Sequence, residues 1–491
     1  MLFVSSRPYR SILTGLALFA GALFANKSTA QQKELYSYRD LSHKYYAAKK
    51  DSLKKNWTCP AVYKEKATQK KYKEYWEDRT DYITGAMERR CFIYEKEVQA
   101  YIDGIVTELM RANPKLIPKK PLLLIDRSSA VNAYSTGSDV LIVNLGLVTF
   151  ANTREELAFV LAHELSHNML RHSDNFMKER AEWFTSDEYK ESMSSVLDSK
   201  YGRYSRLMKI YEGYTFSRSR HSRYHEGEAD SLAVVMLKSS NIAFDPNFLL
   251  RLDSVDVQYK QPLKQPVKNY FASYNLPFDD WWVQKKSKGL STRAYNFKDT
   301  TGIEDSLKTH PDCKLRYATV KKQGSMDKNW TSIPSAIHSK ASRILIWNLF
   351  DDNMLTTCLY RVFMEKDKGN TDVWYNFMMH NVLGGLVYAD NRLNRFNAVG
   401  VLKKEYISKD YYELQNMLEQ MPKEPMEQYY NASRKAAFWS QMSEDAVAFK
   451  QLLHDVIKET DDKELSAALK TFSGKHGSSM YNEFTDHFTN K

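Results

Sequence analysis

The most constraining feature of the sequence is a helix-forming stretch that carries two histidines one turn apart. Thr153 and Glu156 have the spacing of a capping box, which marks the start of a helix. The apolar residues that follow recur at helical spacing: Leu157, Val160, Leu161 and Leu165. We therefore expect an amphipathic helix from about residue 153, with His163 and His167 on one face.

The residues His163-Glu164-Leu165-Ser166-His167 form the pattern HExxH. Side chains four residues apart on a helix lie about 5–6 Å from each other at Cβ, so both imidazoles can converge on one Zn²⁺ ion. Glu164, one position along, lies beside the metal and can polarise a zinc-bound water. Chance gives this pattern in roughly one of fifty such chains, and the capped helix lowers that chance. The motif therefore predicts a catalytic zinc site.

A catalytic zinc ion needs three protein ligands and one open position. Glu226 and Asp230 are four residues apart on a second expected helix, from about residue 224 to 238. Glu226 is the best candidate for the third ligand, and Asp230 can accept the outer N–H of a ligand histidine. His225 and Glu228 are the rival ligands.

The rest of the chain predicts an α+β fold that is mostly α-helical, with a small sheet. Apolar runs at 122–125 and 140–143 read as strands, and 135–139 reads as a turn. The expected parts are a signal peptide at 1–30, a polar helical extension at 31–92, the domain with the metal motif at 93–325, and a helical C-terminal domain at 335–491. The aromatic stretch at 260–300 reads as an insertion whose rings pack, or form a lid.

The first 30 residues resemble a secretory signal. Arg7 and Arg10 precede an uncharged apolar stretch, and small residues follow at 28–30. The apolar stretch is shorter than the ~20 residues of a membrane span, so an uncleaved anchor is the weaker reading. We expect export to the periplasm or secretion.

The formal net charge is +11. It falls to about +8 once the signal segment is removed, with acids and bases mixed throughout. That mild bias, without basic clusters or a known motif, excludes a nucleic-acid binder.

Four cysteines fit an oxidising compartment as one or two disulfides. Their spacing is not that of a zinc ribbon. Of the three possible pairings we expect nearest neighbours, Cys59 with Cys91 and Cys313 with Cys358.

Taken together, these motifs resemble the HtpX and CAAX-prenyl-protease type of zinc metallopeptidase, which is metallopeptidase family forty-eight of the gluzincin group. The similarity covers roughly residues 95 to 320. Its marks, in the order of the family, are Asn132-Ala133-Tyr134, Val143-Asn144-Leu145-Gly146-Leu147, HExxH with Arg171-His172, Glu226-x-x-Ala229-Asp230, Asp245-Pro246, and His310-Pro311 with Arg316.

The resemblance implies a role for each matching residue. His163, His167 and Glu226 would bind one zinc ion per chain, Glu164 would be the general base and then the proton donor, and Asp230 would orient a ligand. The strand at Val140, Ile142 and Asn144 would pair with an extended peptide substrate. His310 would lie near the metal and stabilise the oxyanion or cap the open position, unless it only forms a structural turn. Arg171 and His172 read as charges at a helix C-terminus.

The segment between His167 and Glu226 is polar, so the chain resembles the soluble, exported, BepA-like branch of the family, which often has a tetratricopeptide-like helical domain. The expected function is zinc-dependent hydrolysis of peptide bonds in exported, unfolded or misassembled envelope proteins. The expected partners are these proteins and outer-membrane assembly machinery. The alternative is a periplasmic chaperone or adaptor whose protease site is gated or largely inactive.

Overall fold

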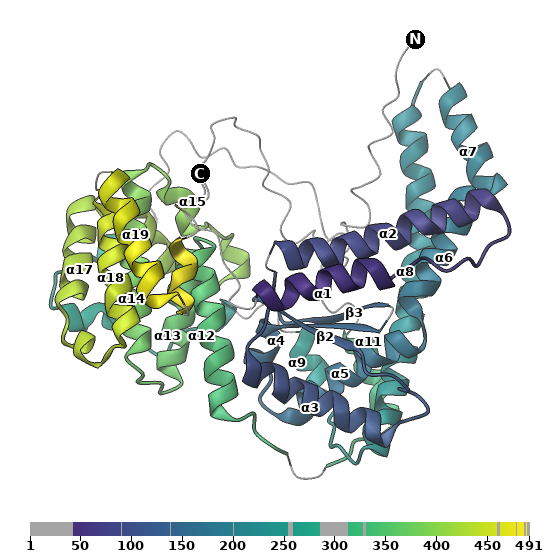
Figure 1. Ribbon diagram of the computed structural model, residues 1–491, viewed down its shortest axis with the longest axis horizontal. Helices are drawn as coiled ribbons and strands as arrows, with labels where there is room; N and C mark the ends of the chain where they lie inside the picture. The colour runs from purple at the N-terminus through teal and green to yellow at the C-terminus, as the bar shows by residue number, and fades with distance from the viewer. Residues whose placement is uncertain are drawn as a thin grey trace. The chain divides into compact units, whose positions relative to one another are not determined.

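The computed structural model describes residues 43–89, 91–137, 139–199, 201–253, 259–284, 313–327, 330–458, 462–477, 479–485 and 488. The expected signal segment at 1–30 lies outside these residues. The chain divides into two units, which we describe separately (Figure 1). The α/β unit contains Ser42–Asp253 and Thr301–Ala341, and the helical unit contains Ser254–Thr300 and Ser342–Lys491.

The α/β unit combines a small sheet with many helices, as the sequence predicts. The strands are β1 (Phe92–Ile93), β2 (Leu122–Asp126), β3 (Ala133–Gly137) and β4 (Val140–Asn144). The helices are α1 (His43–Asn56), α2 (Lys66–Glu88), α3 (Lys96–Ala112), α4 (Leu145–Phe150), α5 (Arg154–Met169), α6 (His172–Thr185), α7 (Asp187–Asp198), α8 (Arg203–Ser239), α9 (Asn247–Asp253) and α11 (Cys313–Lys322).

The strands of the described residues form one sheet in the order β1-β2-β4-β3. β2 and β4 run parallel, and β1 and β3 pair antiparallel with β2 and β4 respectively. All five residues of β4 are buried, as expected for an apolar strand in the middle of a covered sheet. The predicted strands at 122–125 and 140–143 are confirmed as β2 and β4.

Helices α1 and α2 lie over one face of the sheet, while α3 and α5 lie over the other (Figure 1). Tyr46 of α1 and Ile83 and Met87 of α2 pack against Leu124 and Ile142 of the sheet. The segment expected as a polar extension therefore contributes side chains to the core of the α/β unit.

The predicted turn at 135–139 is wrong in part, because Ser135 and Thr136 lie inside β3. The chain reverses only after Gly137, whose φ of +80° suits glycine, and Asp139 also has a positive φ. The middle of β3 is only partly buried, so it can carry polar residues. In the sequence these residues resemble a turn.

Helix α5 begins as predicted. The Glu156 N–H donates to Thr153 Oγ1 and the Thr153 N–H donates to Glu156 Oε2, both at 3.3 Å. Helix α8 contains the predicted helix from about 224 to 238 but has 37 residues and starts at Arg203. It leaves the body of the unit beside α7 (Figure 1).

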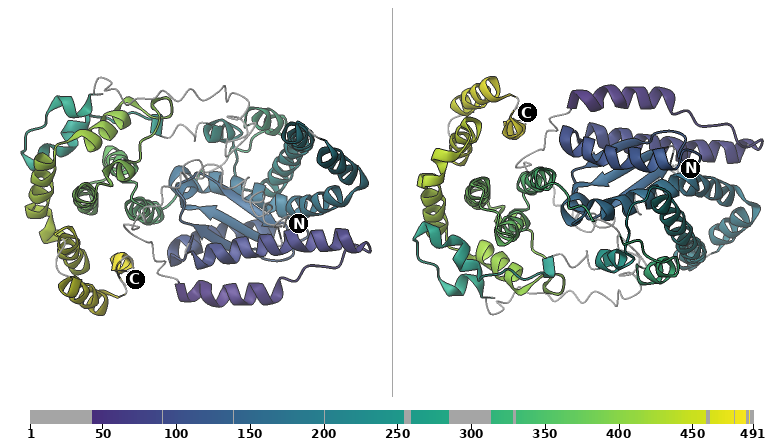
Figure 2. Two further views of the ribbon diagram at one scale, coloured as in Figure 1. Left: turned by 90° about the horizontal axis from the view of Figure 1, so that it is seen from above. Right: turned by 90° about the horizontal axis from the view of Figure 1, so that it is seen from below.

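The helical unit has no strand among its described residues. Its elements are the short helices η4 (Val267–Tyr274), η5 (Asp280–Val283), η6 (Lys404–Tyr406), η7 (Ala437–Gln441) and η8 (Met480–Thr485), and the helices α13 (Leu355–Asp367), α14 (Trp374–Asn391), α15 (Arg395–Val399), α16 (Lys409–Gln420), α17 (Lys423–Lys435), α18 (Glu444–Ile457) and α19 (Asp462–His476). Helix α12 (Ser335–Asp351) begins in the α/β unit and continues into this one. Seen from above, the later helices, drawn in yellow-green and yellow, form an arc around the green ones (Figure 2).

Residues 259–284 of the aromatic stretch belong to the helical unit, not to the domain at 93–325 in which we expected them. Tyr270 stacks on Phe363 with ring centroids 4.0 Å apart, and Phe271 meets Tyr429 edge-on at 5.7 Å. Trp282 is buried. These contacts fit the interpretation of packing aromatics, and residues 285–300 lie outside the described part of the chain.

The expected disulfides are wrong: the four cysteines all lie in the described residues, and none forms a disulfide. Cys313 begins α11 in the α/β unit, whereas Cys358 is buried in α13 of the helical unit. Cys59 packs with the cluster around Tyr72, and Cys91 packs with the separate cluster on the sheet.

A membrane span is also absent from the described residues, since none of their helices is both long enough and apolar enough to cross a bilayer.

Candidate metal centre

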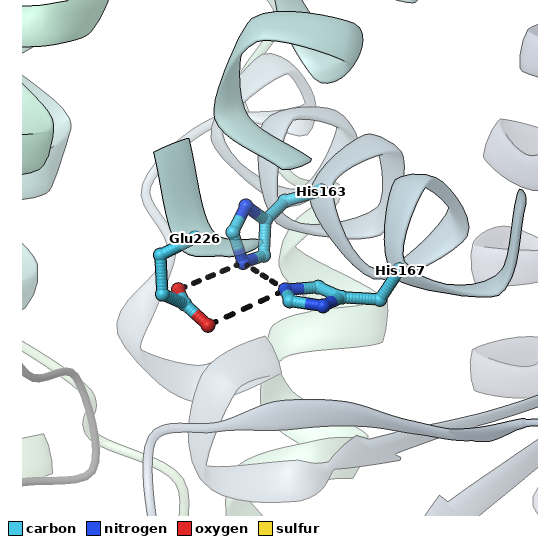
Figure 3. Close-up of side chains that lie close together, drawn as sticks. All are labelled: His163, His167 and Glu226. Carbon is cyan, nitrogen blue, oxygen red and sulfur yellow. Dashed lines mark hydrogen bonds and ion pairs between the residues drawn. The ribbon is translucent and has the colours of Figure 1, made fainter. Parts of the chain in front are cut away.

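Two histidines and a glutamate meet between α5 and α8 (Figure 3). The Nε2 atoms of His163 and His167 lie 3.1 Å apart. Glu226 Oε2 lies 3.4 Å from His163 Nε2, and Glu226 Oε1 lies 3.4 Å from His167 Nε2. The structure therefore brings together the three residues that the sequence predicts as ligands.

These separations fit a zinc ion. Donors bound about 2.0–2.1 Å from a tetrahedral ion lie roughly 3.3–3.4 Å from one another. The donor set of two imidazoles and one carboxylate is that of catalytic zinc sites in which a further position stays open for water or substrate. His163, His167 and Glu226 could thus hold the ion with little movement.

Glu164 lies next to this cluster and is held by β3. Its Oε2 atom accepts a 3.0 Å hydrogen bond from the Ser135 N–H, and its Oε1 atom lies 3.9 Å from His163 Nε2. Burial raises the pKa of Glu164, although His163 and His167 act against the shift. The predicted general base therefore lies next to the three candidate ligands, in an environment that strengthens it as a base.

Behind His163 stands a buried ion pair. Asp230 Oδ1 lies 2.8 Å from His163 Nδ1, and Asp230 has no exposed surface. Arg316 of α11 reaches the same carboxylate through Nε at 2.9 Å and through a terminal nitrogen at 2.8 Å. Its other terminal nitrogen lies 3.3 Å from Glu226 Oε2. Arg316 therefore fixes both the candidate ligand Glu226 and the carboxylate of Asp230, which contacts His163.

The charges of this group hold one another in place. Burial acts to raise the pKa of Glu226 and Asp230, but Arg316 and His163 keep both pKa values well below the usual range. Burial and Arg316 act to lower the pKa of His163, whereas Asp230 and Glu226 raise it to about 9. Both carboxylates are therefore ionised, as binding of a cation requires.

His172 lies next to His167, at a position where the sequence suggested only a helix end. His172 Nδ1 is 2.9 Å from His167 Nδ1, and His172 Nε2 is 3.4 Å from Glu228 Oε2. Arg171 directly follows the C-cap of α5, so the interpretation as a charge at that helix end fits its position. His172 instead begins α6, so the same interpretation does not fit it.

The strand predicted to bind substrate is not at an edge. β4, with Val140, Ile142 and Asn144, is paired with β2 on one side and β3 on the other, so its backbone cannot pair with a peptide. The prediction for these three residues is wrong. Among the described strands β3 is the edge on the side of α5, and its contact with Glu164 places it beside the metal cluster.

Two other expectations concern rival or additional residues. His225 and Glu228 do not join His163 and His167; they gather instead around His172. His310, expected near the metal, lies outside the described residues.

Sequence comparison agrees with this geometry. A search of curated proteins gave no match. Residues 96–323 match the family model described as peptidase family M48, a segment that includes all three candidate ligands, Glu164, Asp230 and Arg316. Together with the cluster of His163, His167 and Glu226, this match supports the M48 metallopeptidase family, whose members are zinc-dependent peptidases.

Proposed function

We propose that the chain is a zinc-dependent endopeptidase in which Glu164 is the general base and His163, His167 and Glu226 hold the metal. The observation that carries the proposal is the placement of a buried carboxylate beside three donors with the spacing of zinc ligands. When bound, zinc lowers the pKa of a water molecule and polarises a carbonyl group.

The residues of the chain would move the proton. The Ser135 N–H holds Glu164 Oε2, which turns Oε1 toward the metal ligands. Glu164 would accept the proton of the attacking water and then deliver it to the amine that leaves. A carboxylate with a raised pKa suits both steps, because it takes up a proton more readily than an exposed glutamate does.

The substrate would bind as an extended strand along β3. Alternate residues of a strand turn their backbone groups to the same side, so Ala133 shares the outer side with Ser135, whose N–H points away from β4 to Glu164. Ala133 is buried, so a peptide that pairs with it must first displace the groups that cover it, and would then lie next to Glu164. Main-chain pairing of this kind recognises a peptide with little dependence on its side chains, which suits unfolded substrates.

The setting that we propose is the bacterial envelope. It rests on the signal-like segment at 1–30, with exported, unfolded or misassembled proteins as substrates. The helical unit would then bind those proteins or the outer-membrane assembly machinery, as a tetratricopeptide-like domain would.

Exchange of Glu164 for Gln tests the mechanism. Glu164→Gln keeps the shape and the hydrogen bond from Ser135 but cannot take up the proton, so we expect casein cleavage to fall by about 10²- to 10⁴-fold while zinc stays bound. The exposed Glu179→Gln on α6 is the matched control and should cleave normally. Cleavage by Glu164→Gln at the wild-type rate would show that Glu164 is not the base.

A further inference from the structure

A second group of metal-binding side chains lies beside the first one. His172, His225 and Glu228 bring one donor atom each within 4.8 Å of one another. His172 is buried, whereas the Glu228 side chain is 36% exposed, so the group is reached from solvent. None of the three belongs to the ligand set of the proposed peptidase.

The two groups use different faces of α8. His225 and Glu228 are three residues apart and share one face, while Glu226 and Asp230 share the neighbouring face toward α5. A carboxylate and a histidine at this spacing on one helix are a recurrent metal-binding pair in helical proteins. The third donor, His172, comes from the start of α6.

The rings of the two histidines are already aligned. His172 and His225 stack with centroids 4.2 Å apart and planes 16° apart, so the two imidazoles lie side by side. His172 Nε2 also lies 3.4 Å from Glu228 Oε2, close to the spacing of two donors on one tetrahedral ion. The three donor atoms lie within 4.8 Å of one another, at most about 1.4 Å beyond that spacing, which rotation of the partly exposed Glu228 side chain can reduce.

We propose that His172, His225 and Glu228 bind a second divalent ion, zinc, more weakly than the first group does. Two imidazoles and one carboxylate form a borderline donor set that favours zinc over magnesium or calcium. The weaker binding follows from the rotation that is needed and from the exposure of Glu228. The proposal does not depend on peptidase activity.

The hydrogen bond between His172 and His167 would link the two metal sites. His172 faces Glu228 through Nε2 and His167 through Nδ1. A neutral imidazole that binds an ion through one nitrogen carries its proton on the other, so an ion on Nε2 moves the proton of His172 to Nδ1. Nδ1 then cannot accept the outer N–H of His167, so that the ligand of the first ion is held less well. Excess zinc should therefore slow a peptidase whose first site is already filled.

Zinc counting on the full chain tests the site. The protein is dialysed to equilibrium against buffered zinc, and bound zinc per chain is measured by mass spectrometry. We expect the wild type to rise from one ion to two as free zinc increases. His225→Ala should stop at one, with binding of the second ion weakened at least tenfold. The His476→Ala exchange, on α19 of the helical unit, is the matched control and should still reach two.

Further variants separate this proposal from the peptidase. Glu164→Gln should still bind two ions, because Glu164 is in neither group. Glu226→Ala should lose the tight ion and keep the weak one. A wild type that stops at one ion, or a His225→Ala protein that matches His476→Ala, would show that His172 and Glu228 form only a hydrogen-bonded pair. Equal inhibition of the wild type and His225→Ala by excess zinc would likewise contradict the proposal.

Discussion

Arg316 supports several residues of the candidate metal centre without being one of its candidate ligands. It binds both oxygens of Asp230 and also approaches Glu226 and His163. Asp230 and His163 are buried, and the Glu226 side chain is only 21% exposed. A buried carboxylate without a partner is costly. The guanidinium group suits this position because it is planar and can donate a hydrogen bond to each oxygen of one carboxylate.

We expect Arg316→Met to weaken zinc binding by about 10- to 100-fold and to destabilise the α/β unit by roughly 3–5 kcal/mol. Arg316→Lys keeps the charge but loses the planar group, so its effects should be intermediate. Zinc affinity is measured by competition with a chelator, and stability by denaturant unfolding.

Arg251→Met is the control. Arg251 forms a 2.6 Å ion pair with Glu156, which is not one of the candidate ligands. Zinc binding unchanged in Arg316→Met would mean that Arg316 does not support the ligands.

At the scale of elements, the sequence predicted α5, β2 and β4, because each combines a clear apolar pattern with a clear boundary. It missed the first half of α8, where charged residues leave no apolar stripe, and the edge strand β3, whose polar residues resemble a turn. The assignment of β4 to the substrate failed for the same reason, since an apolar strand was recognised but its neighbours were not.

The candidate site divides in the same way. The candidate ligands within one helix, His163 and His167, follow from spacing alone. The contacts of Arg316 with His163 join positions 153 residues apart, and no periodicity reports them. Its place after His310 was the only available signal. The contact of His172 with His167 depends on the left-handed backbone at Arg171, which the sequence does not mark with a glycine.

Asp126, the last residue of β2, makes the stability of the α/β unit depend on pH. Burial raises the pKa of Asp126 from 3.8 to about 6, although the Ser128 N–H and Arg127 act against the shift. The native protein therefore keeps a proton that the unfolded chain releases between these two values. The cost of ionising Asp126 is fully present above about pH 6 and disappears as the pH falls below the unfolded value.

Asp126→Asn should accordingly stabilise the α/β unit at pH 7.5 by about 1–3 kcal/mol, with a gain that vanishes near pH 4. Thermal midpoints of both proteins across this range measure it. Asp81→Asn, which removes an exposed carboxylate from α2, controls for loss of charge. A gain that grows toward low pH would show that the sign is wrong.

At the scale of the molecule, every candidate metal ligand found among the described residues lies in the α/β unit. A ligand stabilises only the part of a protein whose native state it binds, by about 4 kcal/mol when it is present at a thousand times its dissociation constant. The helical unit has its own buried core of aromatic and aliphatic side chains. Zinc should therefore act on one unit and not on the other.

Calorimetry with and without a chelator tests this expectation. Removal of zinc should lower one thermal transition by roughly 5–15 °C and leave the transition of the helical unit in place. In Glu226→Ala the first transition should already be low and should respond little to the chelator. Equal shifts of all transitions would show instead that the two units unfold together.

The buried pair of Asp230 and Arg316 also has a consequence for the newly made chain. The two residues are 86 positions apart, and at about 5–20 residues per second Arg316 leaves the ribosome roughly 4–17 s after Asp230. Until then the carboxylate behind His163 has no guanidinium to match it, so the nascent chain carries its HExxH helix in an unfinished pocket. Synthesis itself thus delays the moment at which the candidate metal pocket can be completed.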